Sequence, residues 1–341
     1  MNAIFQPLSS QGFLLADGAT GTNLFAKGLM TGDAPELSNL TAPEKITELH
    51  NEFILAGSDI ILTNSFGGTS YRLKLHNADD KVAEVNKAAA MIARKAADAS
   101  DRPVFVAGSM GPTGELFIPL GALDEAGAVA AFREQAEALA DGGADILWIE
   151  TMSSHEEVMA AISAAKTTGL PVFVTMTFDT AGRSMMGIEP HDFADKAIVA
   201  GVAGFGANCG IGPAELLHSL FGMVEASNHH EDVVLIAKGN CGIPAYVDGE
   251  IHYHGTPELM ADYALAAYRA GASIIGGCCG TTPAHIAAMR QALEAYLAQP
   301  HGRQEITQQE AASLLGQPWA NVPTPPQTDN KAKARRRRRK T

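Results

Sequence analysis

Short apolar segments alternate with longer amphipathic segments along most of the chain, and this alternation constrains the fold more than any other feature. The apolar segments predict strands, and the amphipathic segments predict helices, several of which begin with a proline that suits a first helical turn. The predicted strands are 13–16, 59–62, 104–107, 146–149, 172–176, 204–207, 233–237 and 273–275. The predicted helices are 43–56, 79–98, 124–142, 154–168, 190–200, 213–226, 256–270 and 283–297.

Alternating strands and helices are typical of a parallel sheet that is covered by helices. Eight repeats are the number that closes such a sheet into a (βα)8 barrel, the TIM-barrel fold. We therefore expect an α/β TIM barrel over residues 1–300. An open, doubly wound sheet is the alternative.

The pattern changes near residue 300. Thr307 and Glu310 have the spacing of a capping box ahead of an apolar run, which predicts a short helical extension within 301–317. From Pro318 onward the chain is rich in Pro and then in Lys and Arg, a composition that buries too little apolar area to fold. Residues 318–341 are therefore expected to form a disordered, basic tail.

Charge is distributed unevenly between the predicted barrel and the tail. Eight of the 25 basic residues lie in 331–340, which leaves 17 basic residues against 38 acidic ones before them. An acidic body repels phosphate backbones, so we expect no nucleic-acid binding by the barrel. No apolar run reaches the length of about 18 residues that a membrane span needs, and the N-terminus does not resemble a secretory leader. The expected location is the cytoplasm, without membrane attachment.

All four cysteines follow predicted strands. They are Cys209, Cys241, Cys278 and Cys279. Active sites of parallel barrels lie at the C-terminal ends of the strands, so the four thiols are expected on one rim. Zinc prefers thiolate ligands, and a catalytic zinc site needs only three protein ligands. The alternative is that these cysteines are small buried side chains without a ligand.

A series of motifs at the strand ends resembles the homocysteine S-methyltransferase family, with a match from about residue 11 to 297. The motifs are Asp17-Gly18-Ala19-Thr20-Gly21-Thr22, Thr63-Asn64-Ser65-Phe66, Gly111-Pro112-Thr113-Gly114, Glu150-Thr151, Asn208-Cys209 and Gly276-Gly277-Cys278-Cys279-Gly280-Thr281-Thr282-Pro283 with His285. The resemblance implies a (βα)8 barrel with catalytic zinc, which activates the thiol of homocysteine to accept a methyl group and give methionine.

The same resemblance implies which residues form the site. Cys209, Cys278 and Cys279 would bind the zinc, whereas Cys241, where relatives usually have alanine, would only fill space. Carboxylates would bind the homocysteine ammonium, and Gly-rich loops would bind its carboxylate. The implied substrate contacts are Asp17, Gly18, Ala19, Thr20, Thr63, Ser65 and Glu150.

The methyl donor is less constrained by the sequence. One barrel and a tail leave no room for corrinoid or folate domains, which favours a small onium donor such as glycine betaine. A separate methylated corrinoid protein is the alternative donor. Betaine enzymes of the family carry tyrosines where this chain has Gly67 and Thr151, so a different aromatic cage would be needed. Its candidate residues are Phe66, Tyr71, Phe117, Trp148, Phe178 and Tyr246.

A function without turnover is also open. In that case the chain would be a regulator that binds zinc and homocysteine, with the Arg-rich tail contacting nucleic acid or an acidic partner. Family members are often oligomers, but no segment of this sequence indicates an interface, so a homo-oligomer remains open.

Overall fold

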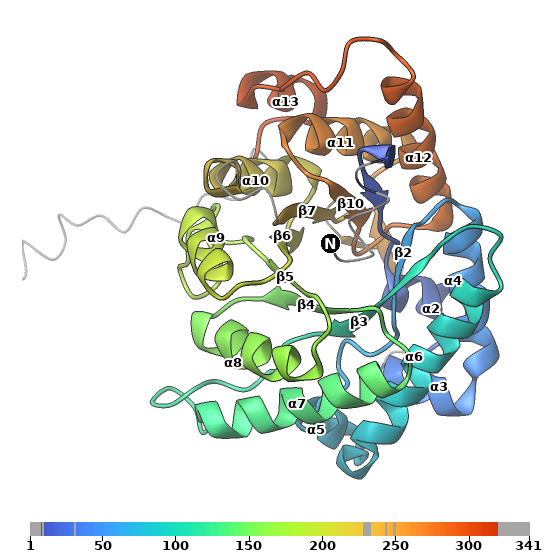
Figure 1. The fold of residues 1–341 in the computed structure, drawn as a ribbon, viewed down its shortest axis with the longest axis vertical. Helices are drawn as coiled ribbons and strands as arrows, with labels where there is room; N and C mark the ends of the chain where they lie inside the picture. The colour runs from blue at the N-terminus through green and yellow to red at the C-terminus, as the bar shows by residue number, and fades with distance from the viewer. Residues whose placement is uncertain are drawn as a thin grey trace, which may run out of the picture.

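The structure is a computed structural model that describes residues 8, 10–30, 32–227, 233–242, 244–247 and 250–319. Its centre is a sheet of eight parallel strands, ordered β1-β10-β7-β6-β5-β4-β3-β2. A parallel bridge between Ala16 and Ile60 joins the two outer strands, so that the sheet closes into a barrel (Figure 1). The strands are β1 (Leu14–Leu15), β2 (Ile60–Leu62), β3 (Phe105–Met110), β4 (Ile146–Met152), β5 (Val172–Met176), β6 (Gly204–Cys209), β7 (Val234–Gly239) and β10 (Ile274–Gly277).

A ring of helices surrounds the barrel (Figure 1). The eight predicted strands and the eight predicted helices are all confirmed, with shifts of a few residues at their ends. The predicted helices correspond to α4 (Pro43–Leu55), α6 (Val82–Asp98), α7 (Glu125–Asp141), α8 (His155–Ala165), α9 (Pro190–Val199), α10 (Pro213–Ser227), α11 (Pro257–Ala270) and α12 (Pro283–Leu297). The TIM-barrel expectation is therefore correct, and the open sheet is not found.

Several shorter helices and a two-stranded hairpin lie around the barrel. Strands β8 (Pro244–Val247) and β9 (Glu250–Tyr253) form an antiparallel hairpin between β7 and α11, which the sequence did not predict. Within the described ranges, the shorter helices with defined bounds include α2 (Thr20–Ala26), α3 (Ser38–Thr41), α5 (Ser70–Leu73) and α13 (Gln308–Leu315), and single 3-10 turns lie at Pro35–Leu37, Lys74–His76, Asp79–Lys81 and Lys166–Thr168.

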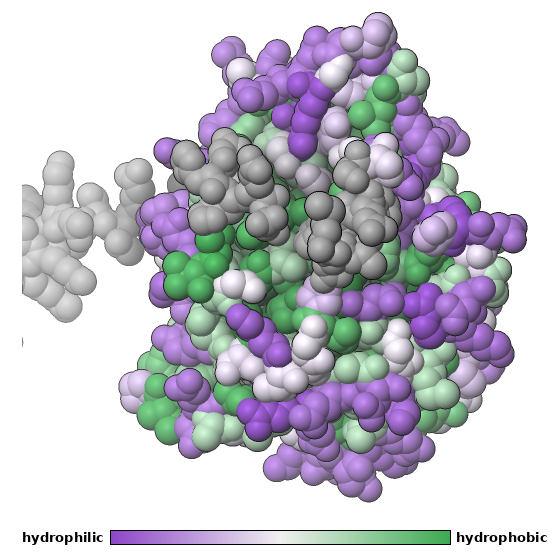
Figure 2. Space-filling model, viewed as in Figure 1, coloured by the Kyte–Doolittle hydropathy of each residue, from purple (hydrophilic) through white to green (hydrophobic). Residues whose placement is uncertain are grey.

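Alternate strand residues face two separate cores. Leu14, Ile60 and Trp148 belong to the smaller core, which fills the barrel, whereas Leu15 and Ile61 belong to the larger core between the strands and the helices. This division follows from the two-residue period of a strand, which places neighbouring side chains on opposite faces of the sheet. Hydrophilic residues make up much of the outline of the molecule in Figure 2. Among the described residues, no helix combines the length and apolar character needed to cross a membrane.

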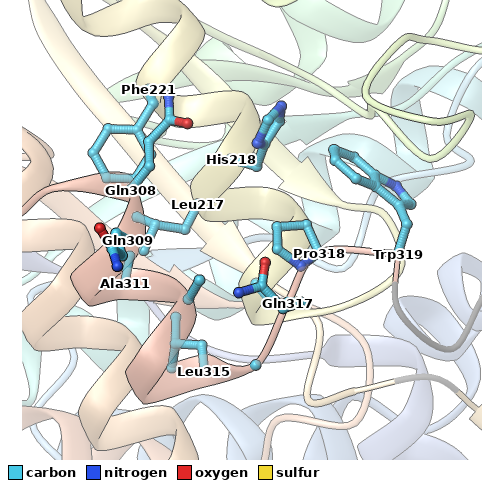
Figure 3. A pocket seen from close by; sticks show the side chains of 13 residues that line it. Leu217, His218, Phe221, Gln308, Gln309, Ala311, Leu315, Gln317, Pro318 and Trp319 are labelled. Carbon is cyan, nitrogen blue, oxygen red and sulfur yellow. The ribbon is translucent and has the colours of Figure 1, made fainter.

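The chain after the barrel returns to α10. Helix α13 begins with a capping box between Thr307 and Glu310, as expected from the sequence. A groove of about 520 Å3 lies between α13 and α10 (Figure 3). At its end, the Trp319 ring packs edge-on against His218 with 4.7 Å between ring centroids, and its backbone N–H donates to Glu215. The rest of the predicted tail, 320–341, lies outside the described residues.

Asp59 ties together three elements at the N-terminal end of the barrel, away from the strand ends where a site is expected. Its carboxylate accepts hydrogen bonds from the Leu15 N–H at 2.8 Å, from Arg102 at 2.9 Å and from Arg290. The side chain is only 9% exposed. Because an amide cannot replace the charge that both guanidinium groups require, Asp59→Asn should lower the free energy of unfolding by about 2 kcal/mol in urea denaturation.

A matched control tests this prediction. Asp98 also pairs with an arginine, Arg94 at 2.8 Å, but its side chain is 66% exposed. Asp98→Asn should therefore change the free energy of unfolding by less than about 0.5 kcal/mol. Equal effects of the two substitutions would contradict the structural role of Asp59.

Candidate active site

Three cysteines meet at the C-terminal end of the barrel. Cys209 ends β6, and Cys278 and Cys279 directly follow β10, which ends at Gly277. The three sulfur atoms lie within 4.8 Å of one another. Because the strand has ended, the two adjacent cysteines escape the alternation that would point them to opposite faces. A tetrahedral zinc with bonds of about 2.3 Å to sulfur separates its ligands by roughly 3.8 Å, so this donor set fits zinc after a small adjustment.

Asn240 links the two loops that carry the cysteines. Its side-chain oxygen accepts a hydrogen bond from the Cys279 N–H at 2.9 Å, and its side-chain nitrogen donates to the Gly210 carbonyl at 2.5 Å. The Cys278 N–H also donates to the Gly239 carbonyl at 2.7 Å. The end of β7 therefore holds the loops after β6 and β10 in a fixed relation to each other.

Two non-glycine residues of the site have left-handed backbone conformations. Cys209 has φ +61° and Thr151 has φ +60°, in a region that such residues rarely adopt. Asn208 joins them: its oxygen accepts from the Thr151 N–H at 2.8 Å, and its nitrogen donates to the Thr151 hydroxyl at 2.7 Å. Strained backbone of this kind persists where the surroundings determine the geometry, as they commonly do at functional sites.

Cys241 does not join the other three cysteines. Its thiol donates to the Gly255 carbonyl at 3.1 Å and lies 3.2 Å from Nε2 of His285. Nδ1 of His285 accepts the Thr282 N–H at 3.0 Å, which leaves the proton of the neutral imidazole on Nε2. Burial raises the pKa of Cys241 to about 11. These contacts support the interpretation of Cys241 as a packing residue rather than a ligand.

Tyr253 is a neighbour of the cysteine cluster that the sequence did not reveal. It lies on the β8–β9 hairpin, and its ring covers Gly280, the residue after Cys279, so closely that a Cβ there would overlap it. Burial, together with the nearby thiols, raises the pKa of Tyr253. Only the contact between hairpin and barrel brings this residue to the site, so no local sequence signal marks it.

A cavity of about 330 Å3 opens beside the cysteines, and its walls carry more apolar than polar surface. The structure brings nearly all of the predicted site residues to its walls. They are Gly18, Ala19, Thr20, Thr63, Ser65, Glu150, Cys209, Cys278 and Cys279. Asp17 is the exception, since it does not line the cavity, whereas Lys238, which was not predicted, does.

A chain of hydroxyl groups runs from the second loop to Glu150. The Ser65 hydroxyl donates to the Ser109 carbonyl at 2.7 Å, so the Thr63 hydroxyl, 2.5 Å away, donates to Ser65. The Ser109 N–H donates in turn to Thr63 at 2.9 Å, and the Ser109 hydroxyl donates to Oε1 of Glu150. Burial raises the pKa of Glu150, and Lys238 and Ser109 oppose that shift. The hydroxyl protons of Thr63 and Ser65 are therefore already engaged within the protein.

A buried ion pair lies next to Glu150. Nζ of Lys238 is 3.1 Å from Oδ1 of Asp17, with the two side chains 2% and 1% exposed. The ammonium also lies 5.5 Å from the centre of the Trp148 ring. Burial alone would lower the pKa of Lys238, but the charges of Asp17 and Glu150 outweigh it and raise that pKa. The sequence offered one signal for a functional role of Lys238, which is the position of a lysine at the end of an apolar strand segment.

Aromatic side chains contribute little to the cavity. Of the six residues considered for an aromatic cage, Phe66 lines it, and the side chain of Tyr246 lies outside the part of the chain that is described. Trp148 is fully buried inside the barrel. Phe25 of α2 is a second, unpredicted aromatic in the cavity wall, and both phenylalanine rings are partly exposed.

Comparison with known proteins gives consistent matches. Residues 14–293 match the family model described as homocysteine S-methyltransferase. Two curated relatives are methionine synthases, from Mycobacterium tuberculosis at 33% identity over 81% of this chain and from Mycobacterium leprae at 30% over 92%. The chain spans only 24% and 27% of the lengths of those proteins. The metallated homocysteine methyltransferase MmuM from Escherichia coli superposes with a TM-score of 0.71 at 26% identity, covering 84% of this chain and 98% of MmuM.

Proposed function

The chain belongs to the homocysteine S-methyltransferase family, and we propose that its cavity binds homocysteine and that a methyl group is transferred there to the homocysteine sulfur, giving methionine. The observation that carries the proposal is the convergence of Cys209, Cys278 and Cys279 beside a cavity that also holds Glu150. The three thiols could hold a zinc ion that binds the thiol of homocysteine, and the carboxylate could bind the ammonium group of homocysteine.

Cys209, Cys278 and Cys279 would hold a zinc ion. Zinc bound there would act as a Lewis acid and lower the pKa of the substrate thiol, which is ordinarily about 8.5. Glu150 would accept the substrate ammonium, and the loop at Gly18, Ala19 and Thr20 would hold the carboxylate. Since the hydroxyl protons of Thr63 and Ser65 are used inside the protein, these two residues would shape the cavity rather than donate to the substrate.

The proposed donor is a small onium compound, with glycine betaine as the first candidate. A sulfur lone pair would form the new bond to the methyl carbon while the methyl–nitrogen bond breaks, its electron pair leaving with the amine as dimethylglycine. Phe25 and Phe66 offer two partly exposed rings in the cavity wall, and ring faces attract quaternary ammonium groups. The largely apolar cavity would keep water from competing for the methyl group.

A methylated corrinoid protein is a second candidate donor, because exposed apolar side chains gather on two loops of the same rim. The loops after β3 and β5 expose Leu116, Ile118, Leu120, Met185 and Met186. Apolar surface of this kind is typical of a docking site for another protein. A macromolecular donor could use it, whereas a small onium compound would not need it.

The decisive experiment is methionine formation by the purified, zinc-supplied protein from homocysteine with betaine as the only donor. We expect methionine and dimethylglycine in equal amounts, activity that disappears on chelation, and recovery when zinc is returned. Turnover only with a methylated corrinoid protein would replace the donor and leave the homocysteine chemistry intact. Tight homocysteine binding without transfer from betaine, from a sulfonium analogue or from methylcorrinoid would favour the regulator instead.

A further inference from the structure

Lys238 is a buried cation that the proposed reaction does not use. Its side chain is 2% exposed, yet it forms part of the cavity wall, whereas its partner Asp17 lies behind it and does not. A buried charge is costly unless it is paired, so a lysine inside a barrel needs a reason to be there.

The two carboxylates near Lys238 differ in whether they have an oxygen that is not yet engaged in a hydrogen bond or ion pair. Both oxygens of Asp17 are engaged, Oδ1 by Lys238 at 3.1 Å and Oδ2 by the Leu62 N–H at 2.8 Å. Glu150 accepts from Ser109 through Oε1, and among the described residues no hydrogen bond reaches its Oε2. One lysine and two carboxylates also leave one uncompensated negative charge. Glu150 is therefore the group that is free to bind a cation.

From this arrangement we infer that Lys238 is a specificity-determining residue. Its ammonium occupies the position beside Asp17 where a substrate ammonium could otherwise bind between Asp17 and Glu150. Glu150 is then the only carboxylate that binds the substrate amino group. The inference rests on the proposed function and narrows its substrate class to thiols that carry a single ammonium group. It also gives Asp17 a different part from the one implied by the family resemblance. Asp17 holds Lys238 and does not touch the substrate.

Asp17→Asn provides the test, because it frees Lys238 to pair with Glu150. The lysine ammonium would then compete with the substrate ammonium, and homocysteine affinity should fall about tenfold or more. Adding Lys238→Met removes the competitor, so the double variant should bind homocysteine clearly more tightly than Asp17→Asn alone. Both changes roughly conserve volume, and the double variant removes the charges of Asp17 and Lys238 together, so that neither partner of their ion pair is left buried alone.

The dissociation constants can be measured by titration calorimetry on the zinc-supplied protein, with thermal unfolding as the check on folding. Homocysteine is compared with 4-mercaptobutanoate, which lacks the ammonium group. Asp17→Asn should reduce the preference for homocysteine over this analogue, and Lys238→Met in the same chain should restore most of it. Calorimetry reports binding even if no methyl donor has been found.

Two other outcomes are informative in different ways. If the double variant binds homocysteine as weakly as Asp17→Asn, then Asp17 itself contacts the substrate ammonium and the role given to Lys238 is overturned. If the wild-type protein fails to bind homocysteine at all, the proposed function fails first.

Discussion

Cys279→Ser is expected to leave the purified protein with little zinc and to lower methyl transfer more than about 100-fold. The substitution removes one of three sulfur donors, and a neutral serine hydroxyl is a poor replacement for a thiolate. Changes in the groups that merely support zinc ligands already cost about 10- to 100-fold in affinity or activity, so the loss of a ligand should cost more. Zinc content by elemental analysis and the rate of methionine formation would both be measured.

Cys241→Ser is the matched control for that substitution. Cys241 is also a cysteine on the same rim of the barrel, but its thiol donates a hydrogen bond to the Gly255 carbonyl and lies beside His285. A serine hydroxyl can make the same hydrogen bond, so zinc content should equal that of the wild type. Loss of zinc from both variants would mean that Cys241 is a ligand, and full zinc in Cys279→Ser would remove Cys279 from the site.

The barrel could be predicted from sequence because its signals are local. Each strand is a short apolar run and each helix has its own period and start signal, as in Val172–Met176 and Pro283–Leu297. The β8–β9 hairpin was missed because it interrupts the repeat between one strand and its helix. Tyr253 is the hairpin residue that lies beside the cysteines among the described side chains. It could not be predicted as part of the site without knowing how the hairpin folds over the barrel.

The site was predictable only in part. The rule that strand ends converge, together with the family motifs, was enough to bring Cys209, Cys278 and Cys279 together. Asp17 and Lys238 are 221 positions apart in the sequence, and no pattern in either segment predicts that the two residues pair. The bonds that occupy the hydroxyl protons of Thr63 and Ser65 likewise depend on side-chain directions that only the three-dimensional structure supplies.

Glu150→Gln is expected to weaken homocysteine binding about 100-fold or more while leaving the binding of 4-mercaptobutanoate nearly unchanged. The amide oxygen can still accept the Ser109 hydroxyl, so the substitution removes the charge and little else. Removing one partner of a buried, hydrogen-bonded charge pair costs about 2–5 kcal/mol, much of it because the other charge is left unpaired. Here that other charge is the substrate ammonium, which 4-mercaptobutanoate lacks. Titration calorimetry with both ligands measures the difference directly.

Glu157→Gln separates this effect from a general loss of structure. Glu157 is also a buried carboxylate, which accepts from the Thr113 N–H at 2.8 Å and the Thr113 hydroxyl at 2.6 Å, but it does not line the cavity. Its substitution should lower the free energy of unfolding and leave homocysteine affinity unchanged. Equal losses of homocysteine affinity in the two variants would mean that Glu150 acts only through the fold. A loss confined to Glu150→Gln, and absent with 4-mercaptobutanoate, would identify Glu150 as the residue that binds the substrate ammonium.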